Sequence, residues 1–60
     1  MADLTTRENE VLILLRMGKT YIEIGTQLEI SQNTVKTHLK SIYRKLGVRN
    51  RTEAVLKNPF

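Results

Sequence analysis

Three signals for the start of a helix lie within only 60 residues, and they constrain the fold more than any other feature of this sequence. Segments 5–8, 20–23 and 50–53 read Thr-Thr-Arg-Glu, Thr-Tyr-Ile-Glu and Asn-Arg-Thr-Glu. In each segment a short polar residue precedes a glutamate by three positions, the spacing at which two side chains cap a helix reciprocally. Helices are therefore expected to begin just after residues 5, 20 and 50.

Ser31, Gly18 and Gly47 supply the remaining helix boundaries. Ser31 is a favourable N-cap, and glycine readily takes the left-handed conformation that ends many helices. The predicted helices cover about residues 6–17, 21–28, 32–46 and 51–57. Because no segment alternates polar and apolar residues as a half-buried strand does, we predict an all-α fold. The expected architecture is a compact four-helix domain, in which a three-helix core containing a helix-turn-helix is followed by a short fourth helix.

The spacing of apolar residues indicates the core. Val35, Leu39, Ile42 and Leu46 repeat at i, i+4, i+7 and i+11, which places them on one side of the third helix. The other predicted core residues are Val11, Leu12, Leu14, Leu15, Ile24 and Leu28, with Ile30 and Val48 at the ends of the core. Gly25 interrupts the second helix, where glycine costs about 0.5–1 kcal/mol relative to alanine. We expect it to permit a close approach to the third helix.

Length and composition exclude several classes of protein. We expect one domain over residues 1–60, because a chain of this size has no room for a deep catalytic cavity beside its core. No cysteine and a single histidine are present, which removes disulfides and the usual metal ligands. The longest apolar run, 11–15, is too short to span a bilayer. The expectation is a cytoplasmic protein that contacts no membrane and has no catalytic residue, metal ion, cofactor or small-molecule ligand.

Charge is divided unevenly between the two halves of the chain. Residues 1–31 hold three Lys or Arg and five acids, a net charge of −2, whereas residues 32–60 hold seven Lys or Arg and one acid, a net charge of +6. Such an asymmetry predicts a polyanionic partner for the second half. A solvated basic helix without a partner is the alternative that charge alone leaves open.

The third helix suggests which polyanion is bound. At about 100° per residue, Asn33, Lys36, Thr37, Lys40 and Arg44 fall opposite the apolar stripe, and the helix carries no acid. Lysine and arginine suit phosphates and guanine edges, and the threonine methyl suits thymine. Duplex DNA is therefore the predicted partner, with Lys36, Thr37 and Lys40 at base edges. Free amides at the starts of the second and third helices can also bind phosphate. The predicted phosphate contacts are Thr20, Tyr21, Ser31, Asn33, Thr34, Arg44 and Lys45.

Three stretches together form a pattern that covers almost the whole chain. They read LTTRENEVLILL at 4–15, GKTYIEI at 18–24 and LEISQNTVKTHLKSIYRKLGVRNRTEAV at 28–55. This pattern resembles the DNA-binding domain of LuxR-type transcriptional regulators. The resemblance implies a bacterial, nucleoid-associated regulator of transcription whose third helix enters the major groove and makes the base contacts named above.

The same resemblance implies a homodimer formed by the fourth helix, with Ala54, Val55 and Leu56 as contact candidates. RNA polymerase is a further candidate partner. The chain departs from the family at Gly25, where alanine is usual, and in its short fourth helix. Two alternatives stay open: region four of a sigma factor, whose opening can look like segment 4–12, and a basic helical module that binds an acidic protein.

Overall fold

The computed structural model describes residues 3–56, and within that range the chain forms four helices and no strand. They are α1 (Thr6–Arg16), α2 (Tyr21–Leu28), α3 (Gln32–Leu46) and α4 (Arg51–Leu56). The prediction of an all-α, four-helix fold is confirmed. The bounds of α2 and α3 equal the predicted ones, whereas α1 ends one residue early because Met17 is its C-cap. Lys57, the predicted end of the fourth helix, lies outside the described residues.

Local capping interactions start the first three helices. The Thr5 hydroxyl accepts a hydrogen bond from the Glu8 amide at 3.1 Å, and the Glu8 carboxylate accepts one from the Thr5 amide at 2.9 Å. Thr20 and Glu23 form the same reciprocal pair at 3.1 and 2.8 Å. The Ser31 hydroxyl caps α3. Each pair satisfies amides that have no partner inside the helix, so these starts are fixed by neighbouring residues alone.

The start of α4 differs from the predicted capping box. The Asn50 side chain accepts a hydrogen bond from the Glu53 amide at 3.0 Å, as expected. The Glu53 carboxylate, however, accepts from the amide of Arg49 at 3.3 Å and not from that of Asn50. Residues 49 and 50 form a bend, which brings the earlier amide within reach of the carboxylate. The reciprocal pair is therefore shifted by one residue.

The helices end in two different kinds of residue. Gly18 and Gly47 follow the last turns of α1 and α3 with φ angles of 83° and 70°, a region that glycine enters without steric cost. The end of α2 is Glu29, with φ 58° and ψ 42°. A residue with a Cβ atom pays about 1–2 kcal/mol for that conformation. The turn is closed by a 2.8 Å hydrogen bond from the Ile30 amide to the Gly25 carbonyl oxygen.

Gly25 lets the backbone of this turn lie directly against α2. The residue is buried, and a Cβ atom placed on it would lie 2.7 Å from the carbonyl oxygen of Ile30 and 3.6 Å from Cγ2 of Val35. The first distance is too short for a carbon–oxygen contact, so alanine would displace the backbone of the turn. The close approach that Gly25 permits is therefore to the turn between the two helices, whereas the predicted contact with α3, at Val35, is an ordinary van der Waals contact.

The core is formed where α1, α2 and α3 meet. Its fully or nearly fully buried apolar residues are Val11, Leu12, Leu14, Leu15, Ile24, Val35, Leu39, Ile42, Leu46 and Ala54. Leu28, predicted in the core, is half-buried at its edge together with Ile30 and Val48. Burying one large apolar side chain stabilises the fold by about 1.5–3 kcal/mol. The apolar stripe of α3 is thus buried in the core, and the opposite face of the helix is available for other contacts.

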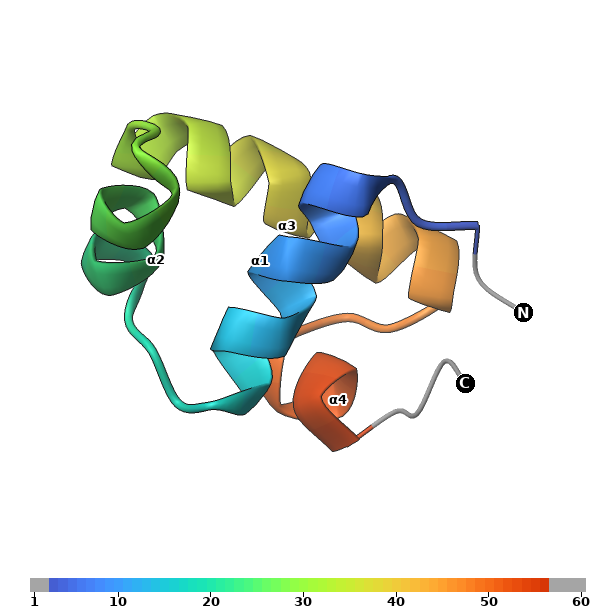
Figure 1. The fold of residues 1–60 in the computed structure, drawn as a ribbon. Helices are drawn as coiled ribbons and strands as arrows, with labels where there is room; N and C mark the ends of the chain where they lie inside the picture. Colours follow the sequence, from blue (N-terminus) through green and yellow to red (C-terminus); the bar gives the residue numbers. More distant parts are fainter. Residues whose placement is uncertain (1–2, 57–60) are drawn as a thin grey trace.

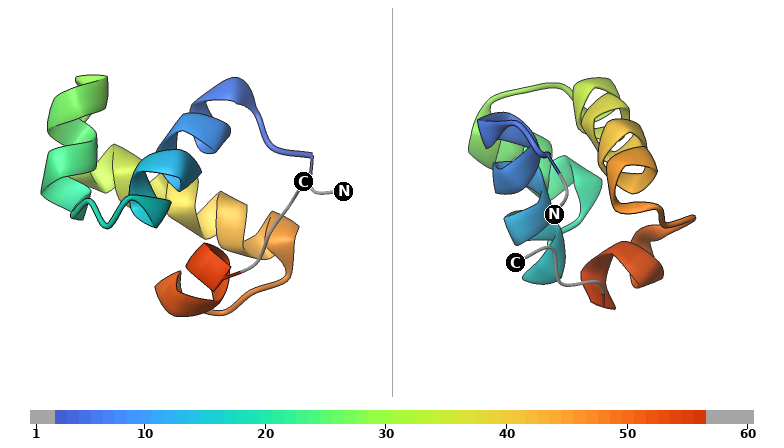
Figure 2. Two further views of the ribbon diagram at one scale, coloured as in Figure 1. Left: turned by 60° about the horizontal axis from the view of Figure 1, so that its bottom comes forward. Right: turned by 90° about the vertical axis from the view of Figure 1, so that its right-hand side faces the viewer.

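The arrangement of the helices exposes one long side of α3. It packs against both α1 and α2, while α4 packs mainly against α1. Figure 1 shows α2 at one end of α3, α4 near the other end and α1 between them. In the right-hand view of Figure 2, α3 runs along one side of the molecule with α1 across from it. The second and third helices and the short turn between them form the predicted helix-turn-helix.

Candidate nucleic-acid interface

The outward side of α3 carries cations that have no anionic partner in the described range 3–56. We call Asn33, Lys36, Thr37, Lys40 and Arg44 the basic face, and all five side chains are exposed. The only ion pair among the described residues lies elsewhere on the molecule. The structure therefore brings these predicted contacts together on one side of one helix, with three uncompensated positive charges.

A hydrogen bond within α3 leaves the methyl group of Thr37 available for an apolar contact. Its hydroxyl donates to the carbonyl oxygen of Asn33 at 3.1 Å. The hydroxyl hydrogen is therefore used, and the side chain has its methyl group and oxygen lone pairs left to offer a ligand. A shallow hollow of about 440 Å³ lies beside it, lined by Thr37, Lys40, Ser41 and Arg44. This part of the basic face is uneven and cationic.

The start of α3 presents hydroxyls that bond to each other. The Ser31 hydroxyl accepts from the Thr34 amide at 3.1 Å, and the two side-chain oxygens lie 2.9 Å apart. Ser31 is exposed and Thr34 is half-buried. Both predicted phosphate contacts therefore take part in this cap, and because only one of the two hydroxyls donates to the other, one hydroxyl hydrogen is left for an acceptor such as a phosphate oxygen.

Thr20 and Tyr21, the other predicted phosphate contacts, line a second hollow of about 260 Å³ at the start of α2. Its remaining lining residues are Ile22, Gln32 and Arg51. The Thr20 hydroxyl already caps α2 by accepting from the Glu23 amide. Next to Tyr21, burial and then the Tyr21 hydroxyl raise the pKa of Tyr43 to about 12, so the phenol of Tyr43 stays neutral.

Arg51 is a contributor to this hollow that sequence reasoning missed. Its Nη2 donates to the carbonyl oxygen of Lys19 at 3.0 Å, which ties the start of α4 to the connection between α1 and α2. The side chain is half-buried. A sequence signal did exist, because a cation in the first turn of a helix opposes the helix dipole and needs another partner. That partner lies 32 residues away, where local patterns give no information.

Lys45 is placed differently from the rest of the predicted phosphate contacts. Its Nζ lies 2.7 Å from Oε1 of Glu8, in the one ion pair that joins two residues of the range 3–56. The sequence analysis predicts that Glu8 caps a helix and that Lys45 is available to contact phosphate. Glu8 does cap α1, but its carboxylate also neutralises Lys45, because the packing of α1 on α3 brings the two together. The phosphate role of Lys45 stays a prediction, now with a competing partner.

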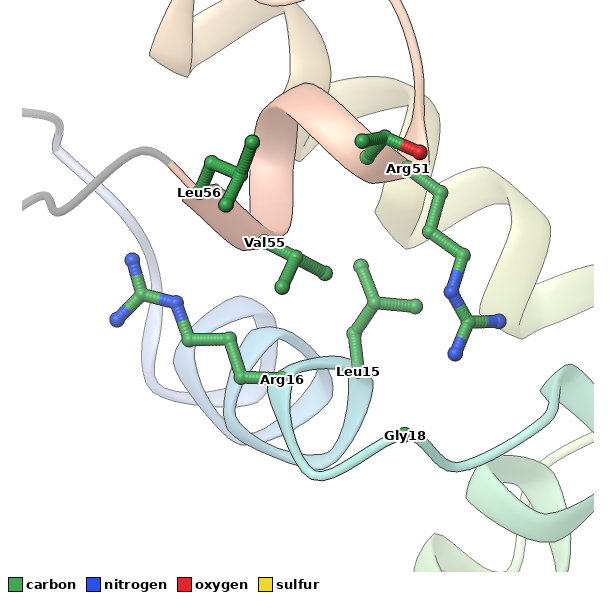
Figure 3. A pocket seen from close by; sticks show the side chains of 7 residues that line it. Leu15, Arg16, Gly18, Arg51, Val55 and Leu56 are labelled. Carbon is green, nitrogen blue, oxygen red and sulfur yellow. The ribbon is translucent and has the colours of Figure 1, made fainter.

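The three dimer candidates on α4 differ in exposure. Ala54 is completely buried, so it belongs to the core and not to a surface open to a second chain. Val55 is half-buried, and Leu56 is 79% exposed. Figure 3 shows Val55 and Leu15 pointing toward one another, with Arg16 and Arg51 on either side. The pocket that these residues line measures about 270 Å³.

Residues 3–56 contain neither a cluster of metal ligands nor a helix that could span a membrane. No three histidine, cysteine, aspartate or glutamate side chains lie close enough together to hold a metal ion. None of the four helices has the length and apolar character needed to cross a bilayer.

Comparison with known proteins identifies the family. The family described as bacterial regulatory proteins, luxR family, matches residues 2–57. The CsgBAC operon transcriptional regulatory protein of Escherichia coli (strain K12) is 54% identical over 52 residues, which are 87% of this chain and 24% of that protein. The chain spans about a quarter of the length of the curated relatives that it matches.

Two solved structures share the fold. The heme-sensing response regulator ChrA superimposes with a TM-score of 0.86 and 47% identity over 92% of this chain and 27% of that one. The transcription factor GerE superimposes with a TM-score of 0.81 and 42% identity over 88% of this chain and 79% of that one. The resemblance to LuxR-type regulators inferred from the sequence is confirmed. This assignment is preferred over the alternative of region four of a sigma factor. The chain belongs to the luxR family of bacterial regulatory proteins and has their helix-turn-helix fold.

Proposed function

We propose that this chain binds duplex DNA sequence-selectively, with α3 in the major groove, as the DNA-binding part of a bacterial transcriptional regulator. The single observation that carries the proposal is the basic face of α3, which is exposed and forms no ion pair with an acid of residues 3–56. A helix fits the major groove, where each base pair presents a distinct pattern of donors and acceptors. Lys36, Thr37 and Lys40 lie within the first nine of the 15 residues of α3, toward the end that usually reaches base edges.

In the proposed complex, contacts with DNA phosphates lie on either side of Lys36, Thr37 and Lys40. Arg44 lies one turn beyond Lys40 and is exposed, so it reaches the backbone rather than the bases. A second set of phosphates is proposed to lie at the other end of α3. They would be bound by the first-turn amides of α2 and α3 and by the guanidinium of Arg51. The proposed phosphate contacts are Thr20, Tyr21, Ser31, Asn33, Thr34 and Arg44.

The family supports the biological setting of this proposal. The CsgBAC operon regulator and LiaR from Bacillus subtilis (strain 168) are both named transcriptional regulatory proteins, and we infer a role of the same kind, without enzyme activity, for this chain. We place the chain in the cytoplasm, at the nucleoid, as one domain over residues 1–60. RNA polymerase is the second macromolecule that such a regulator meets.

A homodimer through α4 is also proposed, with Val55 and Leu56 as its contacts. Leu56 is among the most exposed large apolar side chains of the described range, and it borders the pocket seen in Figure 3. A two-fold dimer would bind two half-sites about one helical turn of DNA apart. Sedimentation that finds a monomer at high concentration, with and without DNA, contradicts this part of the proposal.

Salt dependence of DNA binding tests the proposal. Each phosphate that a cation neutralises contributes about −0.9 to the log–log slope of affinity against salt. Arg44, the cation of the basic face assigned to the DNA backbone, therefore predicts a slope of about −0.9 or steeper. Arg44→Gln is expected to make that slope shallower by about 0.9, whereas Arg7→Gln on α1, a matched loss of one charge, leaves it unchanged. An affinity independent of salt, or equal effects of both substitutions, contradicts the proposal and favours an acidic protein as the partner.

A further inference from the structure

Lys45 lies on α3 but not on its basic face. At about 100° per residue, Lys36, Lys40 and Arg44 follow one another in steps of about 40°. Lys45 lies about 100° beyond Arg44, on the side that also carries Ser41. That side packs against α1. Arg44 and Lys45 are therefore neighbours in the sequence but lie on different sides of α3.

The carboxylate of Glu8 receives Lys45 together with other donors. Lys45 Nζ lies 2.7 Å from Oε1, the Thr5 amide donates to the same oxygen at 2.9 Å, and Ser41 also lowers the pKa of the carboxylate. The Glu8 side chain is only 6% exposed, and that of Lys45 is 30% exposed. The ammonium group of Lys45 is therefore held by a buried carboxylate, although its side chain is partly exposed.

The buried position of Glu8 makes the ion pair hard to exchange for a DNA phosphate. Burial alone would raise the pKa of Glu8, but the hydrogen bonds from Lys45, Ser41 and Thr5 and the charge of Lys45 lower it from 4.5 to about 2. The carboxylate is thus ionised at neutral pH. If Lys45 moved to a phosphate, it would leave a buried anion with one donor fewer, which is costly. A solvated phosphate on the DNA surface offers no comparable gain.

We propose that Glu8 withholds the charge of Lys45 from DNA, so that Lys45 adds no phosphate contact and the carboxyl end of α3 stays fixed on α1. This inference rests on the proposed function. Glu8 is then a positioning residue, and it limits the sequence-independent part of the affinity, which comes from neutralised phosphates. The basic face keeps three cations available, and the fourth cation of α3 serves the protein itself.

Glu8→Gln tests the inference, because glutamine also serves in a capping box but carries no charge to hold Lys45. Glu23→Gln is the matched control: it occupies the same place in the exposed second capping box and raises the net charge equally. The affinity for a random-sequence duplex is measured at a series of salt concentrations. Glu8→Gln is expected to give a log–log slope steeper by about 0.9 than Glu23→Gln, because the released lysine reaches a phosphate.

Two further variants complete the cycle. Lys45→Gln in the otherwise unchanged chain is expected to keep the wild-type slope, and Glu8→Gln/Lys45→Gln is expected to return to the slope of Glu23→Gln. Circular dichroism verifies that each variant is folded. A slope shallower by about 0.9 for Lys45→Gln would mean that Lys45 already binds a phosphate, which overturns the inference.

The failures of the two proposals are distinguishable in the same data. A wild-type chain whose affinity for DNA does not change with salt contradicts the proposed function. A salt-dependent wild type, with equal slopes for Glu8→Gln and Glu23→Gln, contradicts only the withholding of Lys45.

Discussion

The two capping boxes at the starts of α1 and α2 have the same spacing and the same hydrogen bonds but different surroundings. Thr5 and Glu8 are bonded at 2.9 and 3.1 Å, and Thr20 and Glu23 at 2.8 and 3.1 Å. Glu23 is exposed, and its carboxylate accepts a hydrogen bond from the Thr20 amide at the start of the same helix. Glu8 is buried and also holds Lys45. One local motif is thus a helix start in one place and a connection between two helices in the other.

This difference teaches that a capping residue has a second role only where a neighbouring helix covers it. The sequence of segment 5–8 does not predict the contact of Glu8 with α3. The contact exists because the apolar face of α1 packs on α3 and brings position 45 over position 8. The following predictions test whether the two boxes differ only in that respect.

The largest expected difference is in stability after removal of the carboxylates. Glu8→Ala is expected to lower the free energy of unfolding by on the order of 2–3 kcal/mol, because charged hydrogen bonds between α1 and α3 are lost. Glu23→Ala is expected to lower it much less, because only an exposed local cap is lost. In a domain of this size, 1 kcal/mol corresponds to a change in Tm of about 4–8 °C, so thermal unfolding followed by circular dichroism resolves the two. Equal losses would mean that the ion pair with Lys45 contributes no stability.

A smaller difference is expected in the response to acid. The folded-state pKa of Glu8 is about 2, below its ordinary value of 4.5, so its contribution to stability is complete above about pH 5 and is lost as the pH falls toward 2. The difference in Tm between the wild type and Glu8→Gln is therefore expected to shrink across that range. Hydrogen bonds from the Thr20 amide and hydroxyl also lower the pKa of Glu23, so Glu23→Gln follows the same direction less strongly. A difference for Glu8→Gln that stays constant down to pH 2 would contradict the account.

The smallest difference is expected for the threonines. Thr5→Ala and Thr20→Ala each remove one hydroxyl that caps an amide three residues on, which costs about 1 kcal/mol. Denaturant unfolding is expected to give losses that agree within about 0.5 kcal/mol. A clearly larger loss for Thr5→Ala would show that the two boxes differ in their local bonds as well as in their surroundings.

Most of the fold could be predicted from the sequence because its determinants are local. Thr5, Thr20 and Ser31 start helices through neighbours three residues away, and the apolar period of α3 identifies its buried face. The shifted cap at Glu53 was missed, because it depends on a bend in the preceding loop. Glu29 was also missed as a left-handed helix end, since a residue with a Cβ atom rarely takes that conformation.

The candidate site was predictable to the extent that one helix contains it. The basic face follows from the helical period, which is why Lys36, Lys40 and Arg44 emerge together on the exposed side. Lys45 and Arg51 could not be placed in this way. Their partners, Glu8 and the Lys19 carbonyl, lie 37 and 32 residues away and are brought near only by packing of the helices.

Base reading by α3 is tested most directly by the selectivity of Lys40→Ala. A duplex is first selected by the wild-type chain from a random library, and the Kd values of both chains are then measured for that duplex and for a scrambled one at the same salt concentration. The account predicts that Lys40→Ala loses about 1–3 kcal/mol of preference for the selected duplex. An equal loss of affinity for both duplexes would show that Lys40 contacts phosphates only, and it would contradict the reading of bases by α3.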